Sequence, residues 1–295
     1  MSDRKIGPGF VPPARVGTPQ QSGPAPVATP RRAQPAGDGF EGITAPSNQA
    51  QRLGSQRDTD WWGGRPLGEA RNAHQTNTVE EFDDAQASSA NFFEGDVRLE
   101  IDGSGLEMRH DKGHESGDNL TLGQWLDKGR DSGRGLKLDI KEPQHMEAVL
   151  DEARAAGVPD ERLMFNLGFG GMAEWGAEIR EAFPTAFLAI NPPTEGTVGA
   201  AEARKMVDQA RGFGGPVTFV VRHDKLSDEA IRILSEAGPV SVWGSGVNDV
   251  PARTAELRDS GVTGMIDLSG PHHIGPGEVI DAGKNWIRTG LDKIF

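Results

Sequence analysis

The chain has 295 residues, and none of them is cysteine. This absence excludes disulfide bonds, thiolate nucleophiles, iron–sulfur clusters and cysteine-based zinc sites. No run approaches the roughly 18 apolar residues that a membrane helix needs, and the first residues lack the apolar core of a secretory signal. We therefore expect no transmembrane segment, in a protein that is cytoplasmic or exported by a route without a classical signal peptide.

Positive charge is also scarce. Lysine and arginine total 31 against 44 aspartate and glutamate residues, which gives a formal net charge of −13. Such a repulsive field opposes broad docking on nucleic acid or anionic lipid, so no nucleic-acid-binding surface is expected. An anionic ligand must be held by local positive charge or by a metal ion.

Proline is concentrated at the amino-terminal end. Residues 1–57 contain nine of the 20 prolines and show no hydrophobic periodicity, a composition typical of disorder. We predict a disordered Pro/Gly-rich tail over residues 1–60 and one folded domain over 61–295. The tail is weakly basic, and two interpretations stay open: a segment that binds a delivery or partner protein, and an inert extension.

The rest of the chain alternates short apolar runs with amphipathic stretches, which is typical of repeated β/α units. Eight such units in this length predict a (β/α)₈ TIM-type barrel, whose functional groups collect at the carboxyl ends of the strands. The main structural alternative is a doubly wound open sheet. The predicted strands are 70–75, 92–100, 135–141, 163–168, 186–190, 216–222, 239–243 and 263–268, and the predicted helices are 79–87, 122–128, 145–156, 172–183, 200–211, 228–237 and 250–259.

Two of these strands carry charge along one face. Side chains alternate between the two faces of a strand, so Lys137, Asp139 and Lys141 share one face, and Glu94 and Asp96 share another. Inside a barrel these faces converge, and buried carboxylates need a cation. Oxygen ligands without a thiolate favour Mg²⁺ or Ca²⁺. The alternative is an outward-facing edge strand with solvated charges.

Two histidines stand near the same strand ends. His74 closes the first predicted strand, and a hairpin that turns at Asp102-Gly103 returns the chain to His110. The return places His110 near the carboxylates. The alternative is that both are ordinary loop or packing residues.

Further polar and aromatic residues end other predicted strands, where the walls of a pocket belong. Asn166, Arg222 and Trp243 are the candidates for substrate contacts. The alternative for Asn166 and Trp243 is ordinary capping and packing. For Arg222, whose Arg-His-Asp-Lys segment repeats residues 109–112, the alternative is a chance repetition in a loop.

Several motifs carry a family resemblance over residues 72–143. Glu94-x-Asp96, Asp102-Gly103, His110-Asp111 and the stretch from Leu138 to Pro143 together resemble the glycerophosphodiester phosphodiesterases, which belong to the phospholipase-C-like phosphodiesterase barrels. The motif His74-x-x-Asn77 and the sequences of residues 118–126 and 135–141 resemble the menorin branch of that superfamily still more closely.

The resemblance implies roles for these residues. Glu94, Asp96 and Asp139 would bind a divalent metal, while His74 and His110 would exchange protons with the substrate. Lys141 and Lys137 would face the phosphate, and Asn77 would contact the substrate. The sequence departs from the phosphodiesterase pattern at Gln75-Thr76, where Arg-Gly is expected, and at Asp139, where glutamate is usual.

These observations favour a metal-dependent phosphodiesterase, either a hydrolase or a cyclising lyase, that uses histidine acid/base catalysis. Its substrate would be a glycerophosphodiester, a lysophospholipid or another small phosphodiester. A noncatalytic menorin-like barrel that binds a ligand or partner stays open. So does a carbohydrate-active barrel with an acid/base pair of carboxylates.

Overall fold

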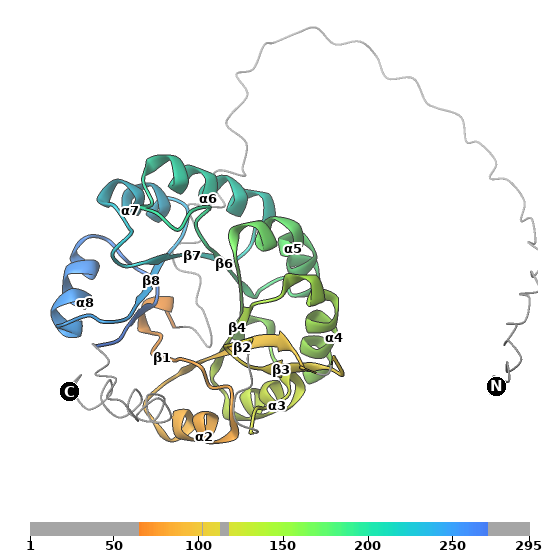
Figure 1. The fold of residues 1–295 in the computed structure, drawn as a ribbon. Coiled ribbons are helices and arrows are strands. Elements are labelled where there is room, and N and C mark those ends of the chain that lie inside the picture. Colours follow the sequence, from red (N-terminus) through yellow and green to blue (C-terminus); the bar gives the residue numbers. More distant parts are fainter. Residues whose placement is uncertain (1–64, 102, 113–117, 271–295) are drawn as a thin grey trace, which may run out of the picture. The chain divides into compact units, whose positions relative to one another are not determined.

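The computed structural model describes residues 65–101, 103–112 and 118–270 (Figure 1). The predicted tail lies outside these residues, so its disorder and the predicted domain boundary near residue 61 stay predictions. Within the described ranges, strands form the middle of the molecule and helices surround them (Figure 1).

The strands form a nearly closed parallel barrel. Their order in the sheet is β1-β2-β4-β5-β6-β7-β8-β9, and β3 pairs antiparallel with β2. Because this order follows the chain without reversal, the doubly wound alternative is excluded and the TIM-type barrel is confirmed. The strands are β1 (Asn72–Ala73), β2 (Phe92–Leu99), β3 (Leu106–Met108), β4 (Gly135–Ile140), β5 (Leu163–Leu167), β6 (Phe187–Ile190), β7 (Val217–Arg222), β8 (Val240–Gly244) and β9 (Ile266–Leu268).

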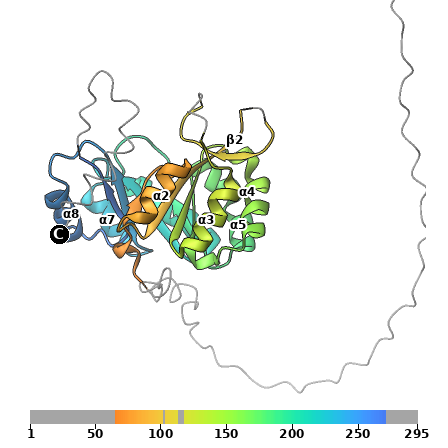
Figure 2. The same cartoon turned by 90° about the horizontal axis from the view of Figure 1, so that it is seen from below.

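The helices follow the strands around the outside of the barrel (Figure 2). Capping boxes at Thr78 and Thr121 start two of them, and left-handed glycines at Gly133 and Gly157 end two. No helix in the described ranges is long and apolar enough to cross a membrane. The helices are α2 (Val79–Ala87), α3 (Leu122–Ser132), α4 (Met146–Ala156), α5 (Phe169–Ala182), α6 (Ala200–Phe213), α7 (Asp228–Ser235) and α8 (Val250–Asp259), with short 3₁₀ turns at Leu67–Glu69, Pro143–His145 and Asp160–Arg162.

Side chains, not backbone pairs, join the two ends of the sheet. Among the described residues, β1 and β9 end the strand order without pairing with each other. The Asn72 amide instead donates to Asp267 at 2.8 Å, and Arg258 donates to the Gly68 carbonyl at 2.8 Å. β1 is also shorter than predicted. Its ladder is limited to β2, and Gln75 just beyond it has a left-handed φ of 52°.

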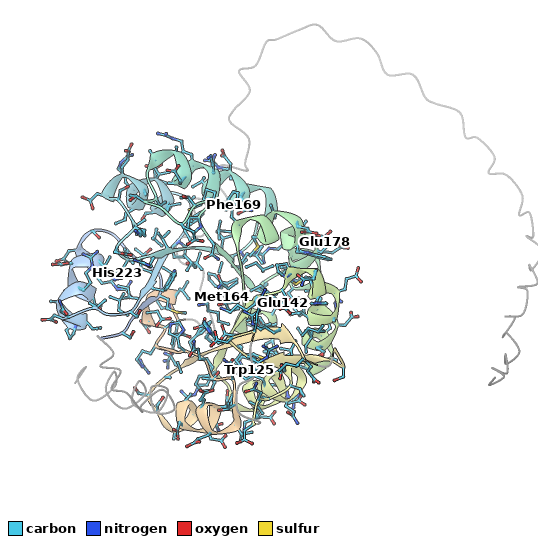
Figure 3. The ribbon with its side chains drawn as sticks, in the orientation of Figure 1. Trp125, Glu142, Met164, Phe169, Glu178 and His223 are labelled. Carbon is cyan, nitrogen blue, oxygen red and sulfur yellow. The ribbon has the colours of Figure 1, made fainter. Side chains whose placement is uncertain are left out.

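The inside of the barrel is layered. A small apolar cluster inside the barrel includes Phe92, Met164 and Phe187, each the first or second residue of its strand. Figure 3 shows Met164 in the middle of the ring of strands. On β2 the next inward side chains after Phe92 are Glu94 and Asp96, because side chains alternate along the strand. Charged residues therefore lie directly above an apolar floor.

Gly95 separates the two inward carboxylates of β2 and lets the outer helix approach closely. A Cβ atom there would lie 2.1 Å from Met108 Cε and 2.9 Å from Trp125 Cε2. Trp125 is fully buried, and its indole N–H donates to Thr76 Oγ1 at 3.0 Å. The packing of α3 on β2 therefore fixes the strand that presents Glu94 and Asp96.

We expect Gly95→Ala to destabilise the protein by about 1–3 kcal/mol, because the added methyl group overpacks the contact with Met108 and Trp125. Chemical denaturation measures the change in the free energy of unfolding. Gly170→Ala is the matched control, since a Cβ at this exposed helical position meets no atom within 4 Å. Equal stability of both variants would contradict the close packing at Gly95.

Candidate active site

A cavity of about 730 Å³ opens at the carboxyl ends of the strands. It brings together most of the side chains that the sequence marks as functional. The residues of this set that line it are His74, Glu94, Asp96, His110, Lys137, Asp139, Lys141, Asn166, Arg222 and Trp243.

Three carboxylates converge in this cavity. Glu94 and Asp96 come from β2 and Asp139 comes from β4, and the register of the two strands pairs Asp96 with Asp139. One oxygen from each of the three carboxylates lies within 4.8 Å of the others. Because adjacent parallel strands align these positions, the inward faces meet as the alternation predicts.

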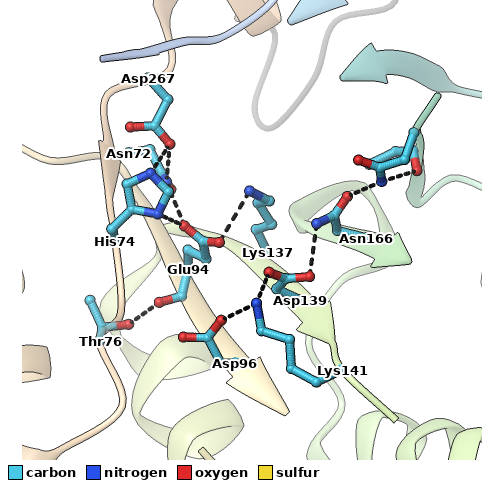
Figure 4. Close-up of polar contacts among 12 residues, drawn as sticks. Asn72, His74, Thr76, Glu94, Asp96, Lys137, Asp139, Lys141, Asn166 and Asp267 are labelled. Atoms are coloured by element: carbon cyan, nitrogen blue, oxygen red, sulfur yellow. Dashed lines mark hydrogen bonds and ion pairs between the residues drawn. The ribbon is translucent and has the colours of Figure 1, made fainter. Parts of the chain in front are cut away.

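Two lysines pair with these three carboxylates (Figure 4). Lys137 Nζ lies 3.2 Å from Glu94 Oε1, and Lys141 Nζ lies 2.8 Å from Asp96 Oδ1 and 2.5 Å from Asp139 Oδ2. Burial alone would lower the pKa of Lys137, but Glu94 and Asp139 outweigh it and raise that pKa above its ordinary value. Burial and the nearby Glu94 raise the pKa of Asp139, against the effect of Lys141.

Asparagine side chains hold the carboxylates from behind. The Asn77 amide donates to Asp96 Oδ2 and accepts from the Asp96 backbone N–H, both at 2.9 Å. The Asn166 amide donates to Asp139 Oδ1 at 2.9 Å, and Asn191 donates to Asn166 at 2.7 Å. Asn77 is buried outside the cavity lining, so the structure does not bring it to the substrate with the others, and its substrate contact stays a prediction.

His74 lies between two carboxylates (Figure 4). Its Nδ1 pairs with Glu94 Oε2, and its Nε2 lies 2.5 Å from Asp267 Oδ2. The Asn72 amide donates to both carboxylates, at 3.1 Å to Glu94 and 2.8 Å to Asp267. Burial alone would lower the pKa of His74, but Asp267 and Glu94 outweigh it and raise it to about 10. His74 is therefore an imidazolium at neutral pH.

Asp267 and Asn72 were not among the residues predicted from sequence. A signal for Asp267 was present, because it is the one charged residue in the last predicted strand, 263–268, between Ile266 and Leu268. It follows the same rule that identifies Glu94 and Asp139, a carboxylate alternating with apolar residues.

His110 stands at the rim of the same cavity. Its side chain is 45% exposed, and Nδ1 lies 3.0 Å from Asp111 Oδ1. This contact leaves Nε2 as the ring atom that can exchange a proton with a bound molecule. Gln75 also lines the cavity at the position where arginine is expected from the phosphodiesterase pattern.

Arg222 and Trp243 form part of the opposite wall. They are register partners on β7 and β8, and Trp243 also pairs with Asp267 on β9. Arg222 Nε donates to Asp224 at 2.5 Å, which lowers the pKa of Asp224 to about 2. Trp243 is 43% exposed and presents an aromatic surface to the cavity.

The donor set fits a divalent cation. Two oxygens on opposite sides of a Ca²⁺ ion at ~2.4 Å lie ~4.8 Å apart, and one oxygen from each of Glu94, Asp96 and Asp139 lies within 4.8 Å of the others. All three supply the hard oxygen atoms that Mg²⁺ and Ca²⁺ prefer. A second group, His74, Glu94 and Asp267, meets the same 4.8 Å limit through one nitrogen and two oxygens.

The fold and this cavity define a TIM-type barrel with a charged cluster at the carboxyl ends of its strands. The family model of the menorin N-terminal domain matches residues 67–161. This segment includes both histidines, both lysines and the three converging carboxylates, but not Asp267. The menorin resemblance predicted from the motifs is confirmed over this part of the chain.

Similar solved structures include a glycerophosphodiester phosphodiesterase from Agrobacterium tumefaciens str. C58, at 16% identity and a TM-score of 0.48, covering 68% of this chain and 97% of that chain. Another is a tryptophan synthase from Pyrococcus furiosus, at 13% identity and a TM-score of 0.45, covering 69% and 88%. The curated proteins contain no match to this chain.

We expect Asp267→Asn to lower the pKa of His74 from about 10 toward its ordinary value near 6.5, because the carboxylate facing Nε2 is removed. Histidine ring NMR measures this pKa in protein kept free of divalent metal with a chelator. Asp224→Asn is the control, because Asp224 pairs with Arg222. An unchanged His74 pKa in Asp267→Asn would contradict the pairing.

The ion pair between His74 and Asp267 makes the free energy of unfolding depend on pH. The folded-state pKa of His74 lies above the unfolded value, so the pairing stabilises the fold fully below about pH 6.5 and is lost as the pH rises through about 10. Asp267→Asn should therefore reduce the free energy of unfolding more at pH 6 than at pH 10. Denaturant titration at both pH values measures the difference, and an equal loss would contradict the linkage.

Proposed function

We propose that this protein is a metal-dependent phosphodiesterase that cleaves a glycerophosphodiester, a lysophospholipid or another small phosphodiester by histidine acid/base catalysis. The observation that carries the proposal is the convergence of three carboxylates, two lysines and two histidines on one cavity. The match of the menorin N-terminal model to the segment that carries all seven residues supports it.

The charge of the cluster supports the proposed role of a metal. Glu94, Asp96, Asp139 and Asp267 outnumber the three cations His74, Lys137 and Lys141 by one. A cluster with this excess of negative charge does not attract an anionic phosphodiester. A divalent cation reverses the sign of the excess, so binding of the anion becomes favourable.

Glu94, Asp96 and Asp139 would hold the divalent cation, either Mg²⁺ or Ca²⁺. When bound, the metal polarises a phosphoryl oxygen and offsets negative charge on the phosphate. Lys137 lies on β4 and Lys141 directly follows it, and both line the same cavity. Their ammonium groups add positive charge for the phosphate oxygens.

The two histidines are suited to opposite tasks. His74 is held as an imidazolium by Asp267 and Glu94, each paired with one ring nitrogen. It would donate a proton to the leaving oxygen once one of these N–H groups turns from its carboxylate to the substrate. His110 on the rim has Nδ1 next to Asp111, and its Nε2 takes the proton of the attacking hydroxyl. That hydroxyl belongs to water in a hydrolase and to the substrate itself in a cyclising lyase.

We expect His110→Ala to reduce turnover by about 10²–10⁴-fold, the usual contribution of a general acid or base. Metal affinity should stay unchanged, because His110 does not belong to the carboxylate group that would bind the ion. His223→Ala is the control, since His223 contacts Arg253 and does not line the cavity. Loss of metal binding in His110→Ala would instead make this residue a metal ligand.

We expect Asp139→Asn to weaken binding of Mg²⁺, Ca²⁺ or Mn²⁺ by at least about tenfold, because one of three charged ligands is removed. Isothermal titration with each metal measures the affinity, and a panel of glycerophosphodiester, lysophospholipid and nucleotide phosphodiesters measures activity. Asp224→Asn is the matched control outside the cluster. A metal affinity of Asp139→Asn equal to that of the wild type would contradict this metal site. Cleavage of a glycoside that continues after the metal is removed with a chelator would favour the carbohydrate-active alternative.

A noncatalytic ligand-binding or partner-binding barrel is the second candidate. It is favoured by the lysines, which contact all three carboxylates directly and so offset most of their charge without a metal. The noncatalytic function would replace the proposed phosphodiesterase activity if the wild-type protein bound no divalent metal and cleaved no substrate in the panel. Mass spectrometry of small molecules that copurify with the protein would then identify the ligand.

A further inference from the structure

A half-buried pair of opposite charges joins the ends of two strands to the loop that carries His110. Arg98 on β2 and Glu142, just after β4, have side chains that are only 11% and 22% exposed. Arg98 Nη1 donates to Glu142 Oε1 at 3.1 Å, and Arg98 Nε donates to the backbone carbonyl of His110 at 2.9 Å. One guanidinium therefore bridges Glu142 and the His110 backbone.

Glu142 extends the pairing of the two strands beyond its regular end. The ladder between β2 and β4 ends at Val97 and Ile140, with one more bond from the Lys141 N–H to the Val97 carbonyl. The second carboxylate oxygen of Glu142 then accepts from the Leu99 N–H at 3.0 Å. Burial alone would raise the pKa of Glu142, but this N–H and Arg98 outweigh it and hold the pKa below its ordinary value.

Arg98 and Glu142 lie close in the sequence to two of the converging carboxylates. Arg98 is two residues after Asp96, and Glu142 is three residues after Asp139. The two side chains thus connect the strands that present these carboxylates to the residue at the rim. Arg109 anchors the same loop separately, through the Leu99 carbonyl at 2.9 Å, Glu107 at 2.6 Å and the Asp111 carbonyl, whereas Arg98 contacts the backbone of His110 itself.

We infer that Arg98 is a positioning residue for His110 and that Glu142 in turn orients Arg98. The inference rests on the proposed function, because it assigns the pair to the placement of the proton acceptor over the carboxylate cluster. Neither residue lines the cavity, so neither contacts the substrate. Proton transfer requires correct placement of both groups, and a misplacement of about 1 Å can reduce the rate about 10²-fold.

Arg98→Met tests the inference, because it keeps an unbranched apolar side chain and removes both donors. The expected result is a fall in kcat of about 10–100-fold, with KM and metal affinity within about twofold of the wild type. In the His110→Ala background, Arg98→Met should cause almost no further loss, because the two residues act through one group. Arg154→Met is the control, a surface arginine paired only with Asp151 among the described residues.

Two further variants separate positioning from general stability. Arg98→Lys should not restore activity, because a single ammonium does not reproduce the guanidinium fork that contacts both partners. Glu142→Gln keeps an acceptor for the Leu99 N–H but removes the negative charge that pairs with Arg98. Its kcat should therefore lie between those of the wild type and Arg98→Met. The inference would be overturned if Arg98→Met reduced kcat by the same factor in the His110→Ala background as in the wild type. A loss of metal affinity in Arg98→Met that parallels its loss of kcat would also overturn it.

Hydrogen exchange tests the same contact without activity. Amides of residues 106–112 should exchange faster in Arg98→Met than in Arg154→Met, while amides of β5–β7 stay unchanged. If the wild type cleaves no phosphodiester, the proposed function fails and this measurement alone decides whether Arg98 fixes the loop. Unchanged exchange in 106–112 would overturn the inference. If Arg98→Met does not fold, the same comparison is made with Glu142→Gln.

Discussion

Neutralisation of buried carboxylates is the constraint on which the rest of this structure depends. Four carboxylates stand at the carboxyl ends of the strands, and Lys137, Lys141 and His74 pair with them directly. An unpaired charge in this environment would be very costly. The apolar floor of the barrel is compatible with the charges above it only because each carboxylate contacts a cation. The pairs lie where adjacent strands bring alternate residues into register.

Much of this arrangement was predictable from local sequence. The eight β/α units follow from hydrophobic patterning, and the helix Val79–Ala87 has the predicted bounds because its capping box marks its start. Glu94, Asp96 and Asp139 stand out because charge alternates with apolar residues inside strands that would otherwise be wholly apolar. A period of two identifies the face of a strand without any knowledge of the partner strand.

Contacts that depend on closure of the barrel were not predictable in this way. Asn72 and Asp267 are 195 residues apart in the chain, and they meet only because the first and last strands become neighbours. The orientation of His74 toward Asp267 likewise requires the complete circle of strands. The bridge from Arg98 to Glu142 depends on the relative lengths of β2 and β4, and strand ends are the least certain part of any sequence-based assignment.

The junction between β1 and β9 links mechanical opening of the barrel to its chemistry. His74, next to β1, pairs with Asp267 on β9. The imidazolium that would donate the proton is therefore also one of the side chains that hold the first and last strands together. Any fluctuation that separates these strands takes one partner away from His74 and makes it a weaker base. A ligand that favours the closed barrel would therefore also favour the protonated histidine. Selection for a tighter junction would then act on activity and folding together.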